Sequence, residues 1–441
     1  MLLGPRLRKI LDLALPIMGG MVSQNAMNLI DTAMVGSQGK HALAAVGMSS
    51  FASFLSSAFL MGLSTGVQAM AARRLGEGRD AEMAVPLNGG LLMAIGLGVP
   101  LSVLLFALAP AFYPYLNDDP QVVAEGVPYL RARLCAVTAV GLNFSFRGYF
   151  NGVNLSRLYL RSLLTMHVCN LALNYALIFG KFGFPALGAT GAGIGSAIAT
   201  WVGSIAYVIM AVRYARGAGF LARLPDRRTV RTMLALSVPS GIRTVFFAGG
   251  MTMLFWIVGR VGTTPLAAAN ILINLTLVAI LPAIGLGMAA ASLVGQALGR
   301  DERDDAMQWG WDVAKIAVGI LVLLGAPMVL APSALLGVFT DDPATIALGR
   351  LPLQIVGATI FFDGIALVLQ NAMLGAGDSR RIMVVGIAIQ WVVFLPCAYL
   401  VGPILGWGLV GIWAVQVGYR LLQAGVFAVM WRQGAWARVA V

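Results

Sequence analysis

Charged side chains are scarce in this chain of 441 residues. Asp, Glu, Lys and Arg together make up 11% of it, whereas hydrophobic residues make up 59%. A soluble globular protein carries about 25% charged residues, so no soluble core accounts for this composition. The sequence therefore predicts an all-α polytopic membrane protein and excludes a soluble enzyme or binding domain.

Cysteine and the common catalytic motifs are also missing. Only three cysteines occur, Cys135, Cys169 and Cys397, and we interpret them as packing residues because they lack the spacing of a metal or redox site. The chain has no Walker sequence, so we do not expect ATP to be the energy source. No nucleophile stands in a pattern with a base or with metal ligands. We therefore expect neither an enzyme nor a bound cofactor.

Basic residues outnumber acidic ones, and the formal net charge is +12. The arginines lie in short loops between apolar runs without interleaved aromatics, which is typical of cytoplasmic membrane-protein loops and not of a nucleic-acid surface. This bias predicts that both termini are cytoplasmic. Few basic residues then face outward: Lys40, Arg131, Arg133, Lys181, Arg260 and Arg350.

Apolar runs long enough to cross a bilayer, about 20 residues each, occur twelve times. They cover approximately 10–35, 43–70, 85–109, 127–147, 160–180, 189–212, 233–259, 265–294, 309–331, 346–373, 382–402 and 407–430.

The second half of the chain repeats the first. Pro239 and Gly259 lie 223 residues after Pro16 and Gly36, and the acidic turn FTDDP (339–343) follows LNDDP (116–120) by the same interval. The repeat predicts two pseudo-symmetric six-helix lobes, residues 1–212 and 232–441, joined by a basic cytoplasmic linker at 213–231. Six is even, so the lobes share one orientation, as in transporters that work by alternating access.

Some polar residues inside the apolar runs have no polar counterpart 223 residues away; they include Asp31, Asn170 and Asn174. Asp31 is the most important of them. A carboxylate inside an apolar run indicates a functional site. Asn170 and Asn174 share a face of helix 160–180, and Ser196 and Thr200 lie one turn apart on helix 189–212. We expect these five residues to form a cation-coupling site. Their hard oxygens suit Na+, with Asp31, Asn170 and Asn174 as ligands, whereas Asp31 alone could carry H+.

Structural roles are also open for the other polar residues inside the apolar runs. His167 shares the face of Asn170 and Asn174, but we interpret it as a packing histidine. In the second half, Asp363, Arg243 and Arg420 lie at similar depth, so Asp363 is expected to pair with one of the two arginines. That pair serves either coupling or structure alone, and these three residues are secondary candidates.

Several segments resemble the MATE (multidrug and toxic compound extrusion) family, and in particular its bacterial NorM-like branch. They are NLIDTAMVG (28–36), ARRLGEGR (72–79), NLALNYALIFGKFGFPALGATGAG (170–193), PLAAAN (265–270) and GQALGRDER (295–303). The resemblance covers essentially the whole chain.

The resemblance implies a twelve-helix antiporter that exports organic cations and other drugs in exchange for Na+ or H+. It also implies that Asp31, Asn170 and Asn174 form the N-lobe cation site and that Asp363 is the C-lobe carboxylate. One position departs from the family pattern. NorM-type members carry a Glu on their seventh membrane-spanning helix, which is the run 233–259 here. The Glu is expected near Phe247, and this run has no acidic residue.

Two alternatives remain open from the sequence. A flippase for lipid-linked precursors can share the two-lobed plan. It would need a strongly cationic cavity, to which Arg243 and Arg420 would contribute two positive charges. A membrane scaffold or receptor is the other, and the intramembrane carboxylates argue against it. We expect the protein to act as a monomer in the lipid bilayer on small-molecule drugs, without nucleic acid.

Overall fold

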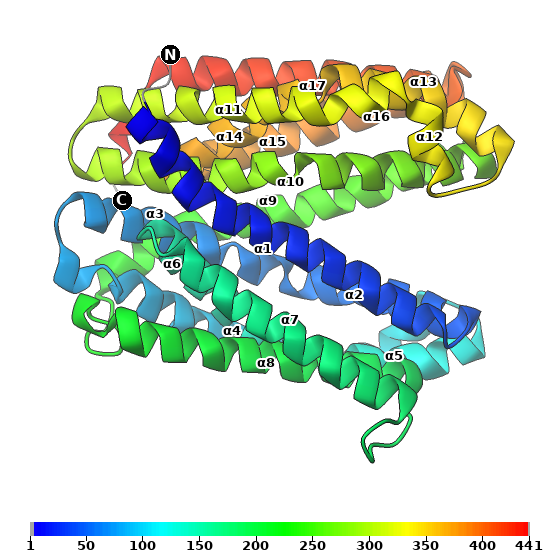
Figure 1. Cartoon of the computed structure of the whole chain (residues 1–441), viewed down its shortest axis with the longest axis horizontal. Helices are drawn as coiled ribbons and strands as arrows, with labels where there is room; N and C mark the ends of the chain where they lie inside the picture. Colours follow the sequence, from blue (N-terminus) through cyan, green and yellow to red (C-terminus); the bar gives the residue numbers. More distant parts are fainter. Residues whose placement is uncertain (1–3, 440–441) are drawn as a thin grey trace. The chain divides into compact units, whose positions relative to one another are not determined.

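The computed structural model describes residues 4–439, and within them the chain is helical, with no strand (Figure 1). Twelve spans follow one another, some of them broken into two helices. By length and apolarity, nine helices of the described residues could cross a membrane, or ten when the pair bent by 52° at Ile360 counts as one span. The remaining two spans are more polar: α1, which carries Asp31, and the run Pro120–Gly152.

The spans of the first half have these bounds: α1 (Gly4–Gly36), α2 with α3 (Lys40–Met61 and Leu63–Gly76), α4 (Val85–Phe112), α5 with α6 (Pro120–Leu134 and Val137–Gly152), α7 (Ser156–Phe179) and α8 (Gly188–Tyr214). Those of the second half are α9 (Arg227–Gly259), α10 (Thr263–Gly299), α11 (Arg303–Leu330), α13 with α14 (Pro343–Thr359 and Phe361–Ala376), the run Ser379–Ile404, and α17 (Gly408–Gln433).

Short elements complete the chain. They are η1 (Asp80–Glu82), η2 (Tyr113–Tyr115), η3 (Arg216–Ala218), α12 (Pro332–Gly337) and η6 (Ala435–Arg438). The run Ser379–Ile404 consists of α15 (Ser379–Ala388), α16 (Leu395–Tyr399) and two π-helical stretches, η4 (Ile389–Phe394) and η5 (Leu400–Ile404).

The two halves repeat each other in structure as well as in sequence. Helices α1 and α9 have bounds that differ by 223 at both ends. Gly39 and Gly262 precede α2 and α10 with φ of 118° and 152°, a region in which residues with a side chain are strained. Asp119 and Asp342 cap α5 and α13 in the same way, each followed by proline in the first helical turn. The predicted duplication is therefore a structural repeat.

The described chain divides into two compact units whose limits differ from the predicted division at 213–231. One unit is Gly19–Gly241, and the other comprises the residues before Gly19 together with those from Ile242 onward. Each unit thus contains the beginning of the other half's first helix. The two exchanged segments have identifiable contacts.

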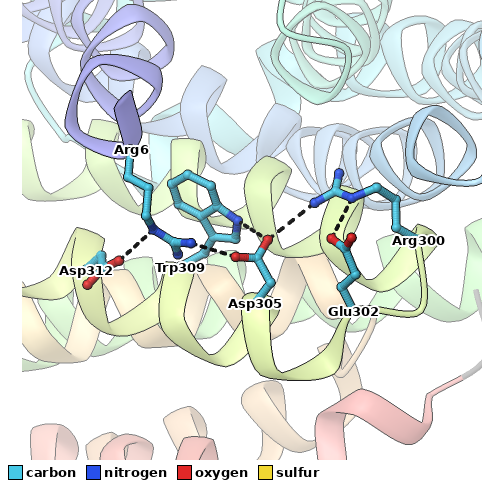
Figure 2. Close-up of polar contacts among 6 residues, drawn as sticks. All are labelled: Arg6, Arg300, Glu302, Asp305, Trp309 and Asp312. Carbon is cyan, nitrogen blue, oxygen red and sulfur yellow. Dashed lines mark hydrogen bonds and ion pairs between the residues drawn. The ribbon is translucent and has the colours of Figure 1, made fainter. Parts of the chain in front are cut away.

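The start of α1 is held by charged side chains of α11 (Figure 2). Arg6 donates to Asp305 at 2.6 Å and to Asp312 at 2.9 Å, and its guanidinium lies 3.8 Å from the ring centre of Trp309. Trp309 donates its indole N–H to Asp305 at 2.7 Å, and Arg300 donates to the same carboxylate at 3.3 Å. This cluster explains why the start of α1 belongs with the second half.

The start of α9 and the connection before it are held in the first unit. The predicted linker is short and packed: Asn88 is buried, donates to the carbonyls of Gly219 (2.9 Å) and Arg223 (2.8 Å), and accepts from the N–H of Leu221. Arg74 donates to the hydroxyl of Thr229 at 3.0 Å. These polar contacts draw residues up to Gly241 into the first unit.

Candidate coupling-ion site

Helices α1 and α7 meet along a seam with a constant register. Gln24 contacts His167 and Asp31 contacts Asn174, and both pairs are 143 residues apart. A constant difference means that the two helices run in the same direction, and a repeat of seven residues keeps one seam in contact over several turns. The seam brings Asp31 onto the polar face of α7 that the sequence predicted.

Asp31 is bound by neutral amides. Asn174, which is fully buried, donates to Asp31 Oδ1 at 2.8 Å. The amide of Asn170 fits best with its nitrogen toward Asp31, at 3.1 and 3.2 Å from the two carboxylate oxygens, and its oxygen accepting from Ser196 Oγ at 3.0 Å. Hydrogen bonds to an ionised group are stronger than neutral ones. The arrangement therefore suits a carboxylate that holds its charge.

The oxygen of the Asn174 amide has no hydrogen-bond partner among the described residues. Gly195 of α8 faces it so closely that a Cβ there would lie 2.3 Å from Oδ1. An unsatisfied buried oxygen costs about 1–3 kcal/mol. Turning this amide would offer its oxygen to a cation, or to a protonated carboxyl, at Asp31. The side chain thus has one orientation for the free carboxylate and another for the occupied one.

Thr200 is the one predicted member that the structure leaves outside this set. Its hydroxyl donates to the carbonyl of Ser196 at 2.7 Å, one turn back on α8. The other four residues come from three helices and meet, so Asp31, Asn170, Asn174 and Ser196 form one connected group. Their oxygen atoms could hold Na+, and Asp31 alone could hold a proton.

His167 has polar partners on α1 that the sequence reading missed. Its Nδ1 lies 2.7 Å from Ser23 Oγ, and its Nε2 lies 3.2 Å from Gln24 Oε1. Gln24 precedes Asp31 by seven residues, as His167 precedes Asn174. That equal spacing was the signal that could have found Gln24.

The second half pairs its charges instead. Asp363 of α14 accepts from Arg420 of α17, and both side chains are largely buried. The structure thus selects Arg420 from the two predicted partners. Arg243 of α9 is half-buried, and its Nε has no hydrogen-bond partner among the described residues.

Helix α9 confirms the absence of an acidic residue at the position of the expected Glu. Phe247 stands there with its side chain exposed, and its carbonyl accepts from Gln390 of η4 at 3.5 Å. Gly250 makes room for Gln390, since a Cβ there would lie 2.1 Å from the amide nitrogen. Among the described residues, α9 therefore offers no carboxylate to a cation around Phe247.

A duplicated helical membrane protein of twelve spans, with a carboxylate inside one of them, has the architecture of a membrane transporter. The family comparison is more specific. The model of the MatE family matches residues 16–176 and 239–400, the two repeated halves, and the chain belongs to this family.

Relatives of known sequence match nearly end to end. A protein of Thermotoga maritima is 27% identical, with 99% of this chain and 95% of that protein covered. One of Xanthomonas axonopodis pv. citri is 30% identical, with 91% and 88% covered. Both are named "Probable multidrug resistance protein NorM", which places this chain near the bacterial NorM-like members, as its motifs suggested.

Solved structures show the same fold. One is an outward-facing multidrug resistance MATE family transporter of the MOP superfamily, with a TM-score of 0.90, 21% identity, and 98% of this chain and 96% of that chain covered. Another is a MOP superfamily transporter from Pyrococcus furiosus, described as having a binding pocket of reverse polarity, with a TM-score of 0.88, 21% identity, and the same two shares covered. The predicted two-lobed, twelve-span membrane fold is confirmed.

Proposed function

We propose that this protein is a secondary active multidrug efflux antiporter. It exports cationic or amphiphilic drugs from a bacterial cell across the inner membrane, in exchange for H+ or Na+, by alternating access. Both termini face the cytoplasm. The observation that carries the proposal is the carboxylate of Asp31, which accepts hydrogen bonds from the two buried amides of Asn170 and Asn174 on α7.

The site supports coupling by competition. Asp31 holds one negative charge among neutral groups, so it gains from binding one positive charge, either the coupling ion or a drug cation. An ion bound from outside disfavours retention of the drug, and release of the ion inside restores the charge. Each ligand can shift the balance of inward and outward states only by its differential affinity for them. Exclusive occupancy of one carboxylate supplies that difference.

Charge pairing in the second half favours drug export over the flippase alternative. A flippase for pyrophosphate-linked lipids needs unpaired cations to hold its substrate. Arg420 is neutralised by Asp363, which leaves Arg243 as the one arginine of the predicted trio without a carboxylate. The pairing also supports a structural role for Asp363, with the coupling ion bound in the first half.

Ethidium transport into or out of proteoliposomes tests the proposal, with a pH gradient and a Na+ gradient imposed separately. Transport driven by pH alone identifies H+ as the coupling ion. Transport driven by Na+ alone identifies Na+, with Asp31, Asn170 and Asn174 as ligands. Absence of transport under both gradients, in protein that is folded and correctly inserted, would contradict the proposal and revive the flippase reading.

A further inference from the structure

A second polar cluster lies on the α1/α7 seam, two helical turns from Asp31. His167 is only 7% exposed, and both of its ring nitrogens have partners on α1. Gln24 presents its amide oxygen to Nε2, because its own nitrogen donates to Asn28 Oδ1 at 3.2 Å. With the two amides in this orientation, Nε2 carries the hydrogen. Nδ1 presents its lone pair to the hydroxyl of Ser23, which can rotate to donate or accept.

This cluster is more than packing. Polar and ionisable groups inside a membrane are costly, and they usually mark ion or proton pathways. Leucine or methionine would fill the space of His167 between two helices without needing two polar partners. An imidazole is a proton acceptor with a pKa near neutrality in its unperturbed form, and it is no ligand for Na+.

Polar groups continue from this cluster toward Asp31. Gln24 donates to Asn28, which lies three residues before Asp31 on the same face of α1 and is exposed. The next residue along that face, Thr32, donates to the carbonyl of Asn28 at 2.8 Å. A line of polar side chains on the open face of α1 thus leads from His167 to Asp31.

We propose that His167, held by Ser23 and Gln24, is a second proton site that receives the proton released by Asp31 and passes it to the cytoplasm. The inference rests on the proposed function, and it identifies H+ as the coupling ion. With the N-terminus cytoplasmic, His167 lies nearer the cytoplasm than Asp31 by seven residues, about 10 Å of helix.

The transfer needs no other reactant. The carboxyl of Asp31 loses its proton and becomes a carboxylate, and Nδ1 of His167 gains a proton to give an imidazolium. The distance is too long for one direct step, so water along the exposed face of Gln24 and Asn28 carries the proton between them. The imidazolium then loses a proton to cytoplasmic water, and the net result is one proton moved inward.

The titratable groups that face α7 from neighbouring helices are few. Asp31 comes from α1, the guanidinium of Arg147 from α6 lies 6.0 Å from the ring of Tyr159, and Tyr207 of α8 donates to the Tyr159 carbonyl. Arg147 and Tyr207 both contact α7 at Tyr159, which lies about two turns from His167 toward the predicted cytoplasmic end. Asp31 is the one carboxylate among them, so it is the natural donor to His167.

Transport by a His167→Gln variant tests the inference, because glutamine keeps hydrogen-bonding capacity but cannot titrate. In proteoliposomes driven by a pH gradient, we expect kcat for ethidium to fall roughly tenfold or more while KM is kept. We also expect the dependence of rate on cytoplasmic-side pH to flatten between about pH 5 and 8. His41→Gln is the matched control, because the chain has two histidines and His41 lies outside the seam, in the first turn of α2 next to Asp119.

A second variant and a direct measurement of histidine titration keep the inference testable if His167→Gln fails to fold. Gln24→Met removes the amide oxygen that accepts the hydrogen bond from Nε2 and leaves the imidazole unchanged. This variant should also alter the dependence of transport rate on cytoplasmic-side pH. Carbon-13 NMR of histidine-labelled protein should show two ring signals, and the one that remains in His41→Gln should titrate.

The outcomes separate the two proposals. If transport depends on Asp31 and on the pH gradient, but His167→Gln keeps the wild-type kcat and pH profile, His167 is a packing residue and this inference alone fails. A Na+-driven carrier without pH dependence also overturns it and leaves antiport intact. Absence of any transport by the wild type would instead contradict the proposed function itself.

Discussion

Two aspartates in membrane-spanning helices have opposite surroundings. Asp31 is bound by amides that can rotate, whereas Asp363 is bound by the guanidinium of Arg420. A carboxylate among neutral dipoles can exchange one cation for another. A carboxylate paired with a buried arginine loses that pair when it is protonated. Under the proposed function, the environment of each residue, more than its depth in the membrane, makes Asp31 the coupling site and Asp363 part of a structural pair.

The same substitution should therefore have different effects at the two positions. Asp31→Asn should abolish drug export and leave the melting temperature of the purified protein unchanged, because asparagine fits among amides. Asp363→Asn leaves Arg420 buried without its partner, which should lower the free energy of unfolding by about 3 kcal/mol. Thermal unfolding in detergent and drug resistance in cells measure the two effects.

A control separates the charge effect at Asp363 from loss of packing. Replacing both partners, Asp363→Leu with Arg420→Leu, should recover most of the stability, because no unpaired charge remains. A double variant as unstable as Asp363→Asn would show that the pair is not the cause.

Gly195 tests the amide of Asn174. A methyl group at Gly195→Ala would lie 2.3 Å from Asn174 Oδ1 and force this side chain to move. We expect ethidium transport to fall about tenfold, since misplacement of a binding group by about 1 Å can cost that much or more. Gly96→Ala in α4 is the control, because nothing lies within 4 Å of its added Cβ. Equal transport by the two variants would mean that the Asn174 amide is unimportant.

At the residue scale, the sequence predicted which polar groups meet but not how they bind. Spacing of three and seven residues placed Asn170 and Asn174 on one face, and the structure brings both to Asp31. Similar depth could not choose between Arg243 and Arg420, because the reach and direction of a side chain depend on tertiary packing. Thr200 illustrates the same limit: its hydroxyl binds its own helix backbone.

At the scale of elements, the repeated acidic turns cap helices. The pKa of the Asp119 carboxyl is held below its usual value, chiefly by the backbone N–H of Gln121. The pKa of Asp342 is also lowered, chiefly by the hydroxyl of Thr345. A carboxyl with a lowered pKa in the folded state stabilises the protein above the unfolded pKa of about 3.9, and this stabilisation is lost as pH falls through the folded pKa.

Removal of a cap should therefore show in acid. Asp342→Ala should destabilise the protein at neutral pH and have less effect in acid, once pH falls through the lowered pKa of the wild-type cap and the cap is itself protonated. Thermal unfolding across this range measures the difference. A destabilisation by Asp342→Ala that stays constant down to about pH 2 would show that the charge of the cap contributes nothing.

The Arg6 cluster should hold the start of α1 in place (Figure 2). Arg6 is 20% exposed and binds two carboxylates, so Arg6→Gln should loosen this end by about 1 kcal/mol. Hydrogen exchange should become faster in the first turns of α1 and stay unchanged around Asp31. Arg8→Gln is the matched control, because Arg8 is 86% exposed and lies 3.8 Å from its partner Asp12. Equal exchange in both variants would contradict a role for the cluster.

The sequence predicted the spans well and their interruptions poorly. Apolar length located all twelve, because the bilayer sets that length. Breaks at Gly62 and Ile360 and the π-helical stretch at Ile389–Phe394 depend on contacts with other helices. Gln390 on that stretch packs against Gly250, more than a hundred residues earlier, and no local pattern indicates such a contact.

At the scale of the molecule, the covalent halves and the compact units differ. A repeat of 223 residues predicts halves that divide at the linker, yet α1 and α9 each begin in one unit and continue in the other. The reason is a set of specific polar contacts made by Arg6 and by Asn88. Neither set of contacts is repeated among the described residues of the other half. Symmetry of sequence does not reveal contacts that are private to one copy.

The division of α1 between the two units bears on how ion binding at Asp31 is coupled to the rest of the protein. Helix α1 has its first turns anchored on α11 by Arg6, and the same helix carries Asp31 to the amides of α7. Whatever changes the charge of Asp31 therefore acts on a helix with attachments in both units. Binding of an ion at a single carboxylate can then influence more than its immediate neighbours.

If drug and coupling ion compete for Asp31, binding of a drug must release the ion. Ion release is measured by adding ethidium to purified protein in weak buffer and counting the protons or Na+ released against the drug bound. We expect about one ion per drug in the wild type and none in Asp31→Asn. Equal release by the wild type and by Asp31→Asn would contradict this competition, because the exchanged ion would then lie elsewhere.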